Sequence, residues 1–292
     1  MKPFSSTPTA FLFSALLLGI STTAVRAAEA ETYQLAKKGY VPPVGTVLTL
    51  ENSMTMKDSA MTIEAQGQQI EGKASRTSSR QEISEVISPT KLRVTIKKAD
   101  SQGTMTVNGQ DQETPEEPEA LLNHPIILEL NDGKWTASLE SGGEPTARQK
   151  ARLNDKEKSA NQESDLEMYG TTPRKVGDEW KADPSKIGVG EGTEMKGDYK
   201  VKFVEVKEVN GIKCAVLKAT YDFKGKMDPS AGKVSSLAMK GEAVSVRSIA
   251  DLTDLEVRLN STTTVDVSPA DGVAVHIVGP TEMIQKSTLK KP

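Results

Sequence analysis

The feature that most constrains this chain is a period-two alternation of apolar and polar residues, which recurs through much of the sequence after residue 40. The clearest example runs from Leu255 to Val267, where polar residues occupy every second position. Successive side chains of a strand point to opposite faces, so this pattern predicts one long strand with one buried face. The apolar residues that share a parity are Leu255, Val257, Leu259, Val265 and Val267.

Two segments nearer the N-terminus show the same alternation. In Lys91–Lys97 the apolar residues at every second position are expected to face inward, and they are Leu92, Val94 and Ile96. In 48–56 the residues Leu48, Leu50, Met54 and Met56 share a parity that Asn52 interrupts. Both segments therefore predict amphipathic strands.

Three short turn signals separate apolar runs of this kind. Asn210-Gly211 stands between two such runs, and both residues tolerate the positive φ angles of a type I′ hairpin turn. Asn131-Asp132-Gly133 and Asp271-Gly272 are similar signals. The three positions predict three hairpins between antiparallel strands.

Other positions predict departures from regular strands. Gly279-Pro280 predicts a bend, because proline cannot donate a hydrogen bond to a central ladder. The parity changes at Phe203-Val204 and within Cys214–Leu217, which predicts bulges or a sheet covered on both faces. The acidic segment Asp111–Glu119 contains two prolines and predicts a loop.

One segment, Glu144–Glu163, has the composition of a helix, with Pro145 at its start. It is rich in charged residues and poor in apolar ones, so we expect a largely solvated connector helix. The connector 142–170 then joins two β-rich halves, 28–141 and 171–292.

The predicted fold class is mainly all-β, with long antiparallel meandering strands that form curved sheets and one charged connector helix. Wide amphipathic sheets twist and have an apolar face that must be covered. A half-barrel would leave an apolar cavity, whereas a sandwich would fill it with a second sheet. The sequence leaves both architectures open.

The first 27 residues have the features of a secretory signal peptide. Lys2 is followed by the apolar or small run 10–20, and Val25-Arg26-Ala27 offers a cleavage position. The run is shorter than the ~20 apolar residues that a spanning helix needs. The single cysteine, Cys214, is far from this boundary, which excludes a lipid-modified N-terminal cysteine. We expect an exported, soluble mature chain in the periplasm or at the cell surface, without a transmembrane segment or lipid anchor.

The composition excludes several kinds of site. One Cys and two His cannot form a multi-thiolate zinc site or an iron–sulfur cluster. His124 and His276 are far apart and lack metal-ligand spacing, so each is expected to be structural. Cys214 lies in an apolar run and is expected to be buried. A formal net charge of -3 provides no basic excess for nucleic acid.

The sequence contains parts of known catalytic motifs but lacks the residues that would complete them. The tetrads Ser88–Lys91 and Ser230–Lys233 have the S-x-x-K form without the S-D-N and K-T-G motifs of penicillin-binding enzymes. Asp251 and Asp254 could bind a cation but belong to no EF-hand loop, and Gly188–Gly192 is neither a P-loop nor a dinucleotide fingerprint. We therefore predict no catalytic residue, metal ligand or cofactor.

The segment Tyr169–Trp180, with Pro173 followed by Val176-Gly177-Asp178-Glu179-Trp180, resembles the Val-Gly-Asp-x-Trp opening of uncharacterised exported bacterial β-rich proteins. The plan of signal peptide, long strands and minor helix also loosely resembles the LolA/LppX-like half-barrel carriers. That resemblance implies an apolar cavity plugged by helices, although the helix here is poor in apolar residues. It implies no functional residue.

These patterns favour an exported non-enzymatic binding protein of the bacterial cell envelope, whose partner is an apolar or lipid-like molecule or another envelope protein. The candidate ligand-lining residues are Leu255, Val257 and Leu259, which would serve equally well as core. One alternative is a structural or adhesion-type envelope protein with fully packed sheets. Another is a carboxylate-dependent hydrolase, because a pair of acidic residues cannot be recognised without coordinates.

Overall fold

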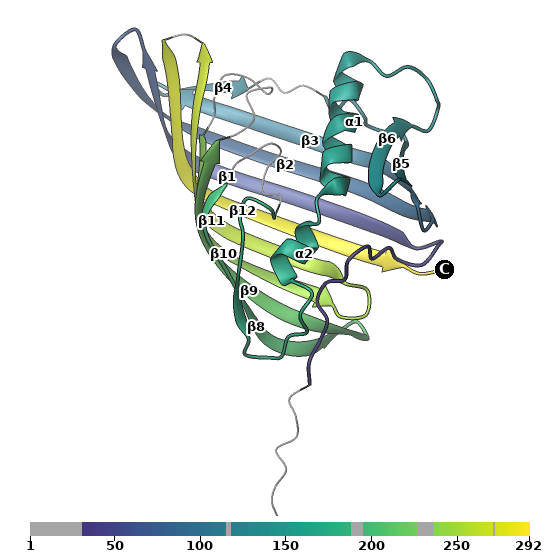
Figure 1. Ribbon diagram of the computed structural model, residues 1–292. Helices are drawn as coiled ribbons and strands as arrows, with labels where there is room; N and C mark the ends of the chain where they lie inside the picture. The colour runs from purple at the N-terminus through teal and green to yellow at the C-terminus, as the bar shows by residue number, and fades with distance from the viewer. Residues whose placement is uncertain (1–30, 115–117, 188–194, 227–235, 271) are drawn as a thin grey trace, which may run out of the picture. The chain divides into compact units, whose positions relative to one another are not determined.

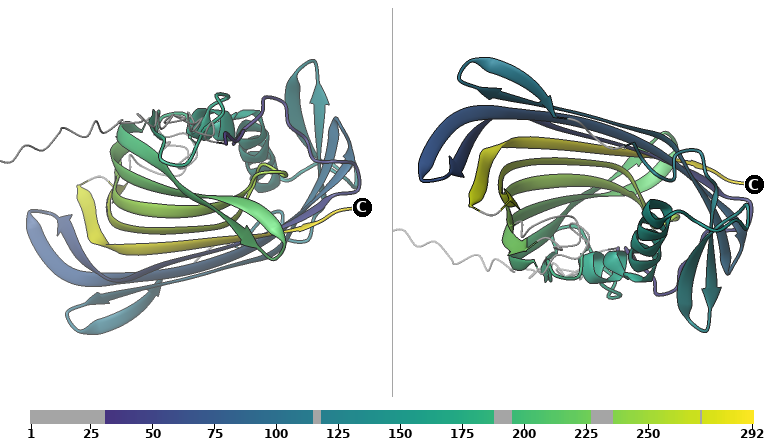
Figure 2. Two further views of the ribbon diagram at one scale, coloured as in Figure 1. Left: turned by 90° about the horizontal axis from the view of Figure 1, so that it is seen from below. Right: turned by 90° about the horizontal axis from the view of Figure 1, so that it is seen from above.

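The computed structural model describes residues 31–114, 118–187, 195–226, 236–270 and 272–292. Glu31–Pro292 forms one compact unit, and its described strands form a single 12-stranded antiparallel sheet (Figure 1). The sheet curves around the side on which both helices lie (Figure 2). The half-barrel alternative is therefore confirmed over the sandwich. The predicted signal peptide, residues 1–27, lies outside the described residues.

The two β-rich halves contribute neighbouring parts of this sheet. The first half supplies β1 (Val47–Ala65), β2 (Gln68–Ser88), β3 (Lys91–Val107), β4 (Gln110–Thr114), β5 (Ile126–Asn131) and β6 (Lys134–Leu139). The helices α1 (Ala147–Asn161) and α2 (Ser164–Tyr169) follow. The second half supplies β7 (Glu179–Ala182), β8 (Lys196–Val209), β9 (Ile212–Lys226), β10 (Ser236–Ser248), β11 (Thr253–Ala270) and β12 (Val273–Lys290).

The strand order is β6-β5-β3-β2-β1-β12-β11-β10-β9-β8-β7, and β4 pairs with β3. Strands that follow each other in sequence therefore mostly pair, as in a meander. The exception that joins the halves is the long β1–β12 ladder, in which Val47 faces Lys290 and Ala65 faces Val273. The first and last long strands of the chain thus meet at the middle of the sheet.

The alternation predicts the long strands correctly. Leu255–Val267 lies within β11 and Lys91–Lys97 within β3. The Asn210-Gly211 turn joins β8 to β9 with φ angles of 50° and 79°, and Asp132-Gly133 joins β5 to β6 in the same way. The predicted bulge at Phe203-Val204 is confirmed by a register shift between Phe203 and Glu205. Of the third turn, Asp271 lies outside the described residues.

The bend predicted at Gly279-Pro280 is wrong, because β12 continues through both residues. The neighbouring strand explains this. A bulge in β1 shifts the register between Met56 and Ala60 at the level of Pro280, so the ladder with β1 is already interrupted there. A missing proline N–H costs least at such a position. Ser59 of the bulge fills the space that Gly279 leaves by having no Cβ.

Two further expectations are corrected around the connector. Part of the loop predicted over Asp111–Glu119 is β4, which pairs with the far end of β3, while 115–117 lie outside the described residues. The predicted helix is found as α1, which Thr146 caps through a capping box. A second short helix, α2, was not separated from it by the sequence pattern.

Two apolar clusters hold the helices against the concave face of the sheet. Cluster 1 lies over β8–β10 and includes Leu35 from the N-terminal segment and Tyr169 from α2. Cluster 2 lies over β3 and β5 and includes Leu121 and Leu153, the one buried residue of α1. Neither described helix is long and apolar enough to cross a membrane. The concave face is therefore covered from two sides.

Candidate functional site

The cross-strand register identifies the side chains that share the concave face between the two clusters. Met54 of β1 faces Met283 of β12, which faces Leu259 of β11. Leu259 packs against cluster 1, which places this row on the concave side. Directly opposed residues in a sheet point to the same face. Methionines gather on this face of the central strands, and they are Met54, Met56, Met61, Met105, Met239 and Met283.

This methionine strip is only partly covered. Met61 is 2% exposed, because its side chain lies over Gly72. Met54 and Met283 are half-buried, as is Met56. The apolar strip along β1 and β12 thus continues beyond the part of the sheet that the helices cover.

A cavity of about 750 Å³ opens on this strip. Met54 and Met283 form its apolar side, and its polar side comes from β2, β3 and α1. A second cavity of about 410 Å³ adjoins it along α1, since both share Asn52, Arg80 and Glu119. The polar residues that line the larger cavity include Asn52, Arg76, Ser78, Arg80, Ser101 and Arg152.

Ion pairs form the wall of the two cavities. Arg80 Nη1 donates a 2.8 Å hydrogen bond to Glu119 Oε2, and Lys156 of α1 donates a 2.5 Å bond to Glu82 Oε2 on β2. The Glu119 side chain is 7% exposed. Burial raises the pKa of Glu119, but the Leu121 amide and the Arg80 guanidinium lower it by more, so the carboxylate is stabilised. These pairs fix α1 and the segment before β5 to the sheet.

Asn52 stands where the apolar and polar sides of the cavity meet. Its Oδ1 atom is buried and accepts no hydrogen bond from any described residue. A buried amide oxygen without a donor is costly. The position is therefore suited to a donor on a water molecule or a ligand.

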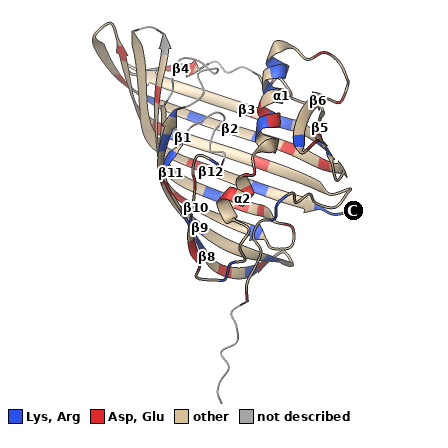
Figure 3. Ribbon diagram, viewed as in Figure 1, with Lys and Arg blue, Asp and Glu red and all other residues tan. Residues whose placement is uncertain are grey.

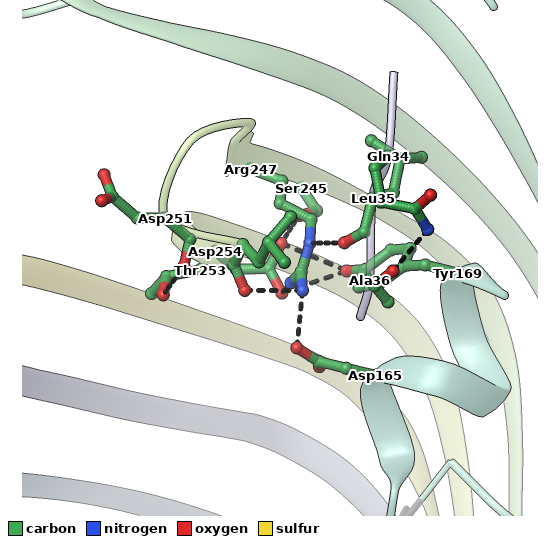
Figure 4. A network of polar contacts seen from close by, with 11 residues as sticks. Gln34, Leu35, Ala36, Asp165, Tyr169, Ser245, Arg247, Asp251, Thr253 and Asp254 are labelled. Carbon is green, nitrogen blue, oxygen red and sulfur yellow. Dashed lines mark hydrogen bonds and ion pairs between the residues drawn. The ribbon is translucent and has the colours of Figure 1, made fainter. Parts of the chain in front are cut away.

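A second group of polar residues lies beneath α2 and centres on Arg247 (Figure 4). Arg247 is 1% exposed and comes from β10. Its Nε donates to Leu35 O at 2.7 Å, and its Nη1 donates to Asp254 Oδ2 at 2.9 Å. Its Nη2 donates to Asp165 Oδ2 at 2.5 Å and to Leu252 O at 2.6 Å. One guanidinium thus joins the N-terminal segment, α2 and the β10–β11 turn.

Asp254 accepts further hydrogen bonds in this network. Ser245 Oγ donates to it at 2.5 Å, and the Tyr169 hydroxyl donates at 3.0 Å. The Tyr169 ring also lies 4.1 Å from the guanidinium carbon of Arg247. Burial raises the pKa of Asp254 and that of Tyr169, while Arg247 opposes both effects. These groups are engaged with one another, which indicates a structural role.

No protein-family model matches the chain, and no curated protein matches it. Among solved structures, lipovitellin aligns with 10% identity and a TM-score of 0.41, covering 85% of this chain and 25% of that chain. This chain therefore spans about a quarter of lipovitellin. A Bacteroides fragilis protein with a YmcC-like fold aligns with 9% identity and a TM-score of 0.25, covering 89% of this chain and 100% of the other.

A DUF1329 family protein from Desulfovibrio piger aligns with 10% identity and a TM-score of 0.18, covering 82% of this chain and 85% of that chain. At these scores the likenesses establish neither a common fold nor a shared function. The resemblance of Val176–Trp180 to the opening of exported β-rich proteins stays a prediction.

Of the three residues predicted to contact a ligand, Val257 and Leu259 share a face of β11, and this is the concave face. Val257 faces Ser245, and Leu259 packs against cluster 1. Leu255 falls at a register shift between β10 and β11. None of the three is among the described residues that line the 750 Å³ cavity. Their contact with a ligand stays a prediction.

The histidines and the cysteine flagged in the sequence lie elsewhere. His276 Nδ1 is 2.5 Å from Asp266 Oδ1 across β11 and β12, and His124 lies in the turn before β5. The described residues contain no group of three or more His, Cys, Asp or Glu side chains that could hold a metal ion. Cys214 is buried as predicted, and burial raises the pKa of its thiol.

The two aspartates, the S-x-x-K tetrads and the glycine run flagged in the sequence form no site among the described residues. Asp254 is engaged with Arg247, whereas Asp251 binds Ser248 Oγ and lies 2.7 Å from Lys291 Nζ. Ser88–Lys91 forms the tight turn between β2 and β3. Ser230–Lys233 and Gly188–Gly192 lie outside the described residues.

The sequence pattern does not predict the arginines and serines that line the cavity. Arg76, Ser78 and Arg80 occupy alternate positions of β2, a strand whose central part is polar at nearly every position. No apolar alternation marks that region. Only the shared parity of Met54 and Met56 in β1 signalled this part of the concave face.

Proposed function

We propose that this protein is an exported, non-enzymatic binding protein of the bacterial cell envelope that holds an apolar ligand on the concave face of its sheet. The observation that carries the proposal is the half-buried methionine strip beside the 750 Å³ cavity. The apolar and small residues of 10–20 support export.

The free-energy cost of exposing the methionine strip to water favours a bound apolar ligand. Apolar surface that stays in water forgoes about 25 cal/mol per Å² of burial free energy. The helices recover this free energy over the two clusters but leave Met54 and Met283 half-buried. Ligand sites are commonly concave, with volumes of about 300–1,000 Å³, and the larger cavity falls in that range.

The residue type also suits an apolar ligand. Methionine has a flexible, polarisable side chain that adapts to irregular shapes. A row of methionines can therefore close around an extended hydrocarbon without a rigid, preformed pocket. A filled structural sheet would instead favour branched side chains in fixed rotamers.

The carboxylates near the concave face give less support to a hydrolase. Asp254 and Glu119 each bind an arginine, and Glu82 binds Lys156. A general acid would need a carboxyl group whose proton is available to a substrate. We therefore place binding ahead of hydrolysis.

The test is native mass spectrometry of the protein purified from its own envelope, followed by solvent extraction. We expect an added mass that extraction releases as an apolar compound, and binding of a fluorescent apolar probe after extraction. Met283→Gln is expected to weaken probe binding. Ile284→Gln, at the next position of β12 and on the opposite face, is the matched control. A chain that is free of added mass and binds no probe would contradict the proposal.

A further inference from the structure

We infer that the ligand is a neutral amphiphile, with a hydrocarbon chain and an uncharged head that donates a hydrogen bond, as a hydroxyl or a carboxamide does. This inference rests on the proposed function and specifies the ligand of that same site. The head would lie at Asn52, whose Oδ1 atom would accept its hydrogen bond. The chain would lie along Met54 and Met283.

The register places a hydrogen-bonding group directly beside the methionine strip. Asn52 and Met54 are two residues apart in β1, so both side chains point to the concave face. Across the ladder with β12, Asn52 faces Gln285 and Met54 faces Met283. Two neighbouring cross-strand pairs thus lie side by side, one of carboxamides and one of thioethers. A ligand that satisfies both pairs must itself be amphiphilic.

The charged side chains that line the two cavities are already engaged with partners. Figure 3 shows both signs of charge on the sheet and on α1. Arg80 Nη1 lies 2.8 Å from Glu119, and Glu82 accepts a hydrogen bond from Lys156. The other partners are Ser101 for Arg76, Lys98 for Asp100, and Asp155 for Arg152. A charged head would have to displace one of these partners, whereas a neutral head would not.

Asn52 differs from these residues in having a buried polar atom without a partner. Among the described residues that line the two cavities, it alone has a buried side-chain oxygen or nitrogen that makes no hydrogen bond. Such an acceptor has lost its water and is costly to leave unsatisfied. The O–H or N–H of a ligand can restore the missing hydrogen bond, whereas an ether or a carboxylate has no hydrogen to donate. The head therefore needs a donor.

Gln285 is the residue we expect to contact the same head from the other side. It is half-buried and directly faces Asn52, at about 4.5–5.5 Å between opposed Cβ atoms. A carboxamide carries two donors and one acceptor oxygen, so Gln285 can donate to the oxygen of the head while Asn52 accepts from it. A hydroxyl or a carboxamide head, which both donates and accepts, suits a position between two carboxamides.

The experiment compares three ten-carbon ligands on the extracted protein, by displacement of the fluorescent apolar probe N-phenylnaphthylamine at neutral pH. Decanol donates and accepts a hydrogen bond, decyl methyl ether only accepts one, and decanoate is an anion. We expect decanol to bind about 10-fold more tightly than the ether or decanoate, because only decanol satisfies the buried acceptor. Added salt should leave the affinity for decanol unchanged, since no charge is engaged.

Asn52→Leu is expected to weaken binding of decanol about 10-fold and to leave the ether unchanged. The midpoint of thermal unfolding should not fall, because the substitution also removes a buried acceptor that has no partner. Asn260→Leu is the matched control, since Asn260 is an exposed asparagine of β11 that follows Leu259 and points to the opposite face. This variant should bind all three ligands like the unaltered chain.

The outcomes separate this inference from the proposed function. Equal binding of decanol and the ether, or an equal effect of Asn52→Leu on both, overturns the donor head and keeps the apolar ligand. Tighter binding of decanoate than of decanol overturns the neutral head. A lower unfolding midpoint for Asn52→Leu overturns the assignment of Asn52 to the ligand, since the amide would then stabilise the fold. A protein that binds no probe overturns the proposed function as well.

Discussion

Arg247 Nη1 lies 2.9 Å from Asp254 Oδ2, and the two residues face each other across β10 and β11. Their side chains are 1% and 16% exposed. The pair meets at a register shift in β11, which turns Asp254 toward the covered face of the sheet. A buried ion pair is thus built into the point where the N-terminal segment, α2 and the sheet come together.

Removing one partner of this pair should be costly. We expect Arg247→Ala to lower the free energy of unfolding by about 3–5 kcal/mol, because Asp254 would stay buried without its cation. Arg258→Ala removes an exposed arginine of β11 and should cost less than about 1 kcal/mol. Urea unfolding followed by circular dichroism compares the two. Equal costs would show that the buried pair is not a major source of stability.

The role of Arg247 could not be predicted from the sequence. In Val244-Ser245-Val246-Arg247 the alternation places both valines on one face and both polar residues on the other. It predicts that Arg247 faces solvent, whereas Arg247 lies on the covered face. Its partner Leu35 is 212 residues away in the sequence. Local patterns predict the strand but do not identify distant groups that cover it.

The position of the cavity also could not be predicted from local sequence patterns. The parity of Leu48, Leu50, Met54 and Met56 predicts that they share a face, and the structure agrees. That β1 pairs with β12 is a long-range relationship that periodicity does not contain. The neighbour of each strand decides whether its apolar face meets a helix, another methionine or an arginine. The sequence therefore predicted the kind of sheet but not the site on it.

Gly279 should tolerate no side chain. A Cβ at this position would overlap the side chain of Ser59, in the bulge of β1. Ser59 is completely buried, in a part of the sheet where backbone shifts are costly. We expect Gly279→Ala to lower the free energy of unfolding by about 1–3 kcal/mol or more.

Ser59→Gly is the compensating change for Gly279→Ala. The double variant should be more stable than Gly279→Ala alone, because it removes the two closest overlapping atoms, Ser59 Oγ and Cβ, and leaves only Cα, at 2.7 Å from the added Cβ. Gly143→Ala is the control for adding a Cβ without a clash, since Gly143, like Gly279, has no positive φ and its Cβ would lie 3.8 Å from Ser141 Oγ. Thermal unfolding of the four variants and the unaltered chain gives the comparison. Additive effects of the two changes would contradict the proposed contact.

Glu119 should make stability depend on pH in the acid range. Its pKa lies below the ordinary value, because the Leu121 amide and Arg80 more than offset its burial. A carboxylate with a depressed pKa contributes stability above its unfolded pKa of about 4.3, and this contribution is lost as the pH falls through its folded pKa. The stability lost in Glu119→Gln should therefore be largest at neutral pH, about 1–3 kcal/mol, and should shrink below about pH 4.

The control for this pH dependence is Glu129→Gln. Glu129 is 49% exposed and lies 4.0 Å from Lys91, so the substitution removes a charge without unpairing a buried arginine. We expect it to change the stability by less than about 0.5 kcal/mol at neutral pH. Urea unfolding at several pH values measures both variants. A cost of Glu119→Gln that does not change with pH would refute the assignment.

We expect Leu153 to be the main apolar contact that holds α1 against the sheet. Although α1 is a charged and largely solvated helix, Leu153 is 5% exposed and packs in cluster 2 with Ile96, Leu121 and Ile126. Leu153→Ala is expected to lower the free energy of unfolding by about 2–5 kcal/mol, the range for a buried leucine. Ala151→Ser changes an exposed residue of the same helix and should cost less than about 1 kcal/mol.

The effect of Leu153→Ala should also be local. Trp135 packs against cluster 2, so loosening of α1 should shift its fluorescence to longer wavelength and speed amide exchange in Ala147–Asn161. Because Lys156 and Arg152 of α1 line the smaller cavity, the same change should weaken binding of an apolar probe. Amide exchange in β8–β10, which carry cluster 1, should stay slow. Uniformly faster exchange through the whole sheet would show instead that α1 and the sheet unfold as one unit.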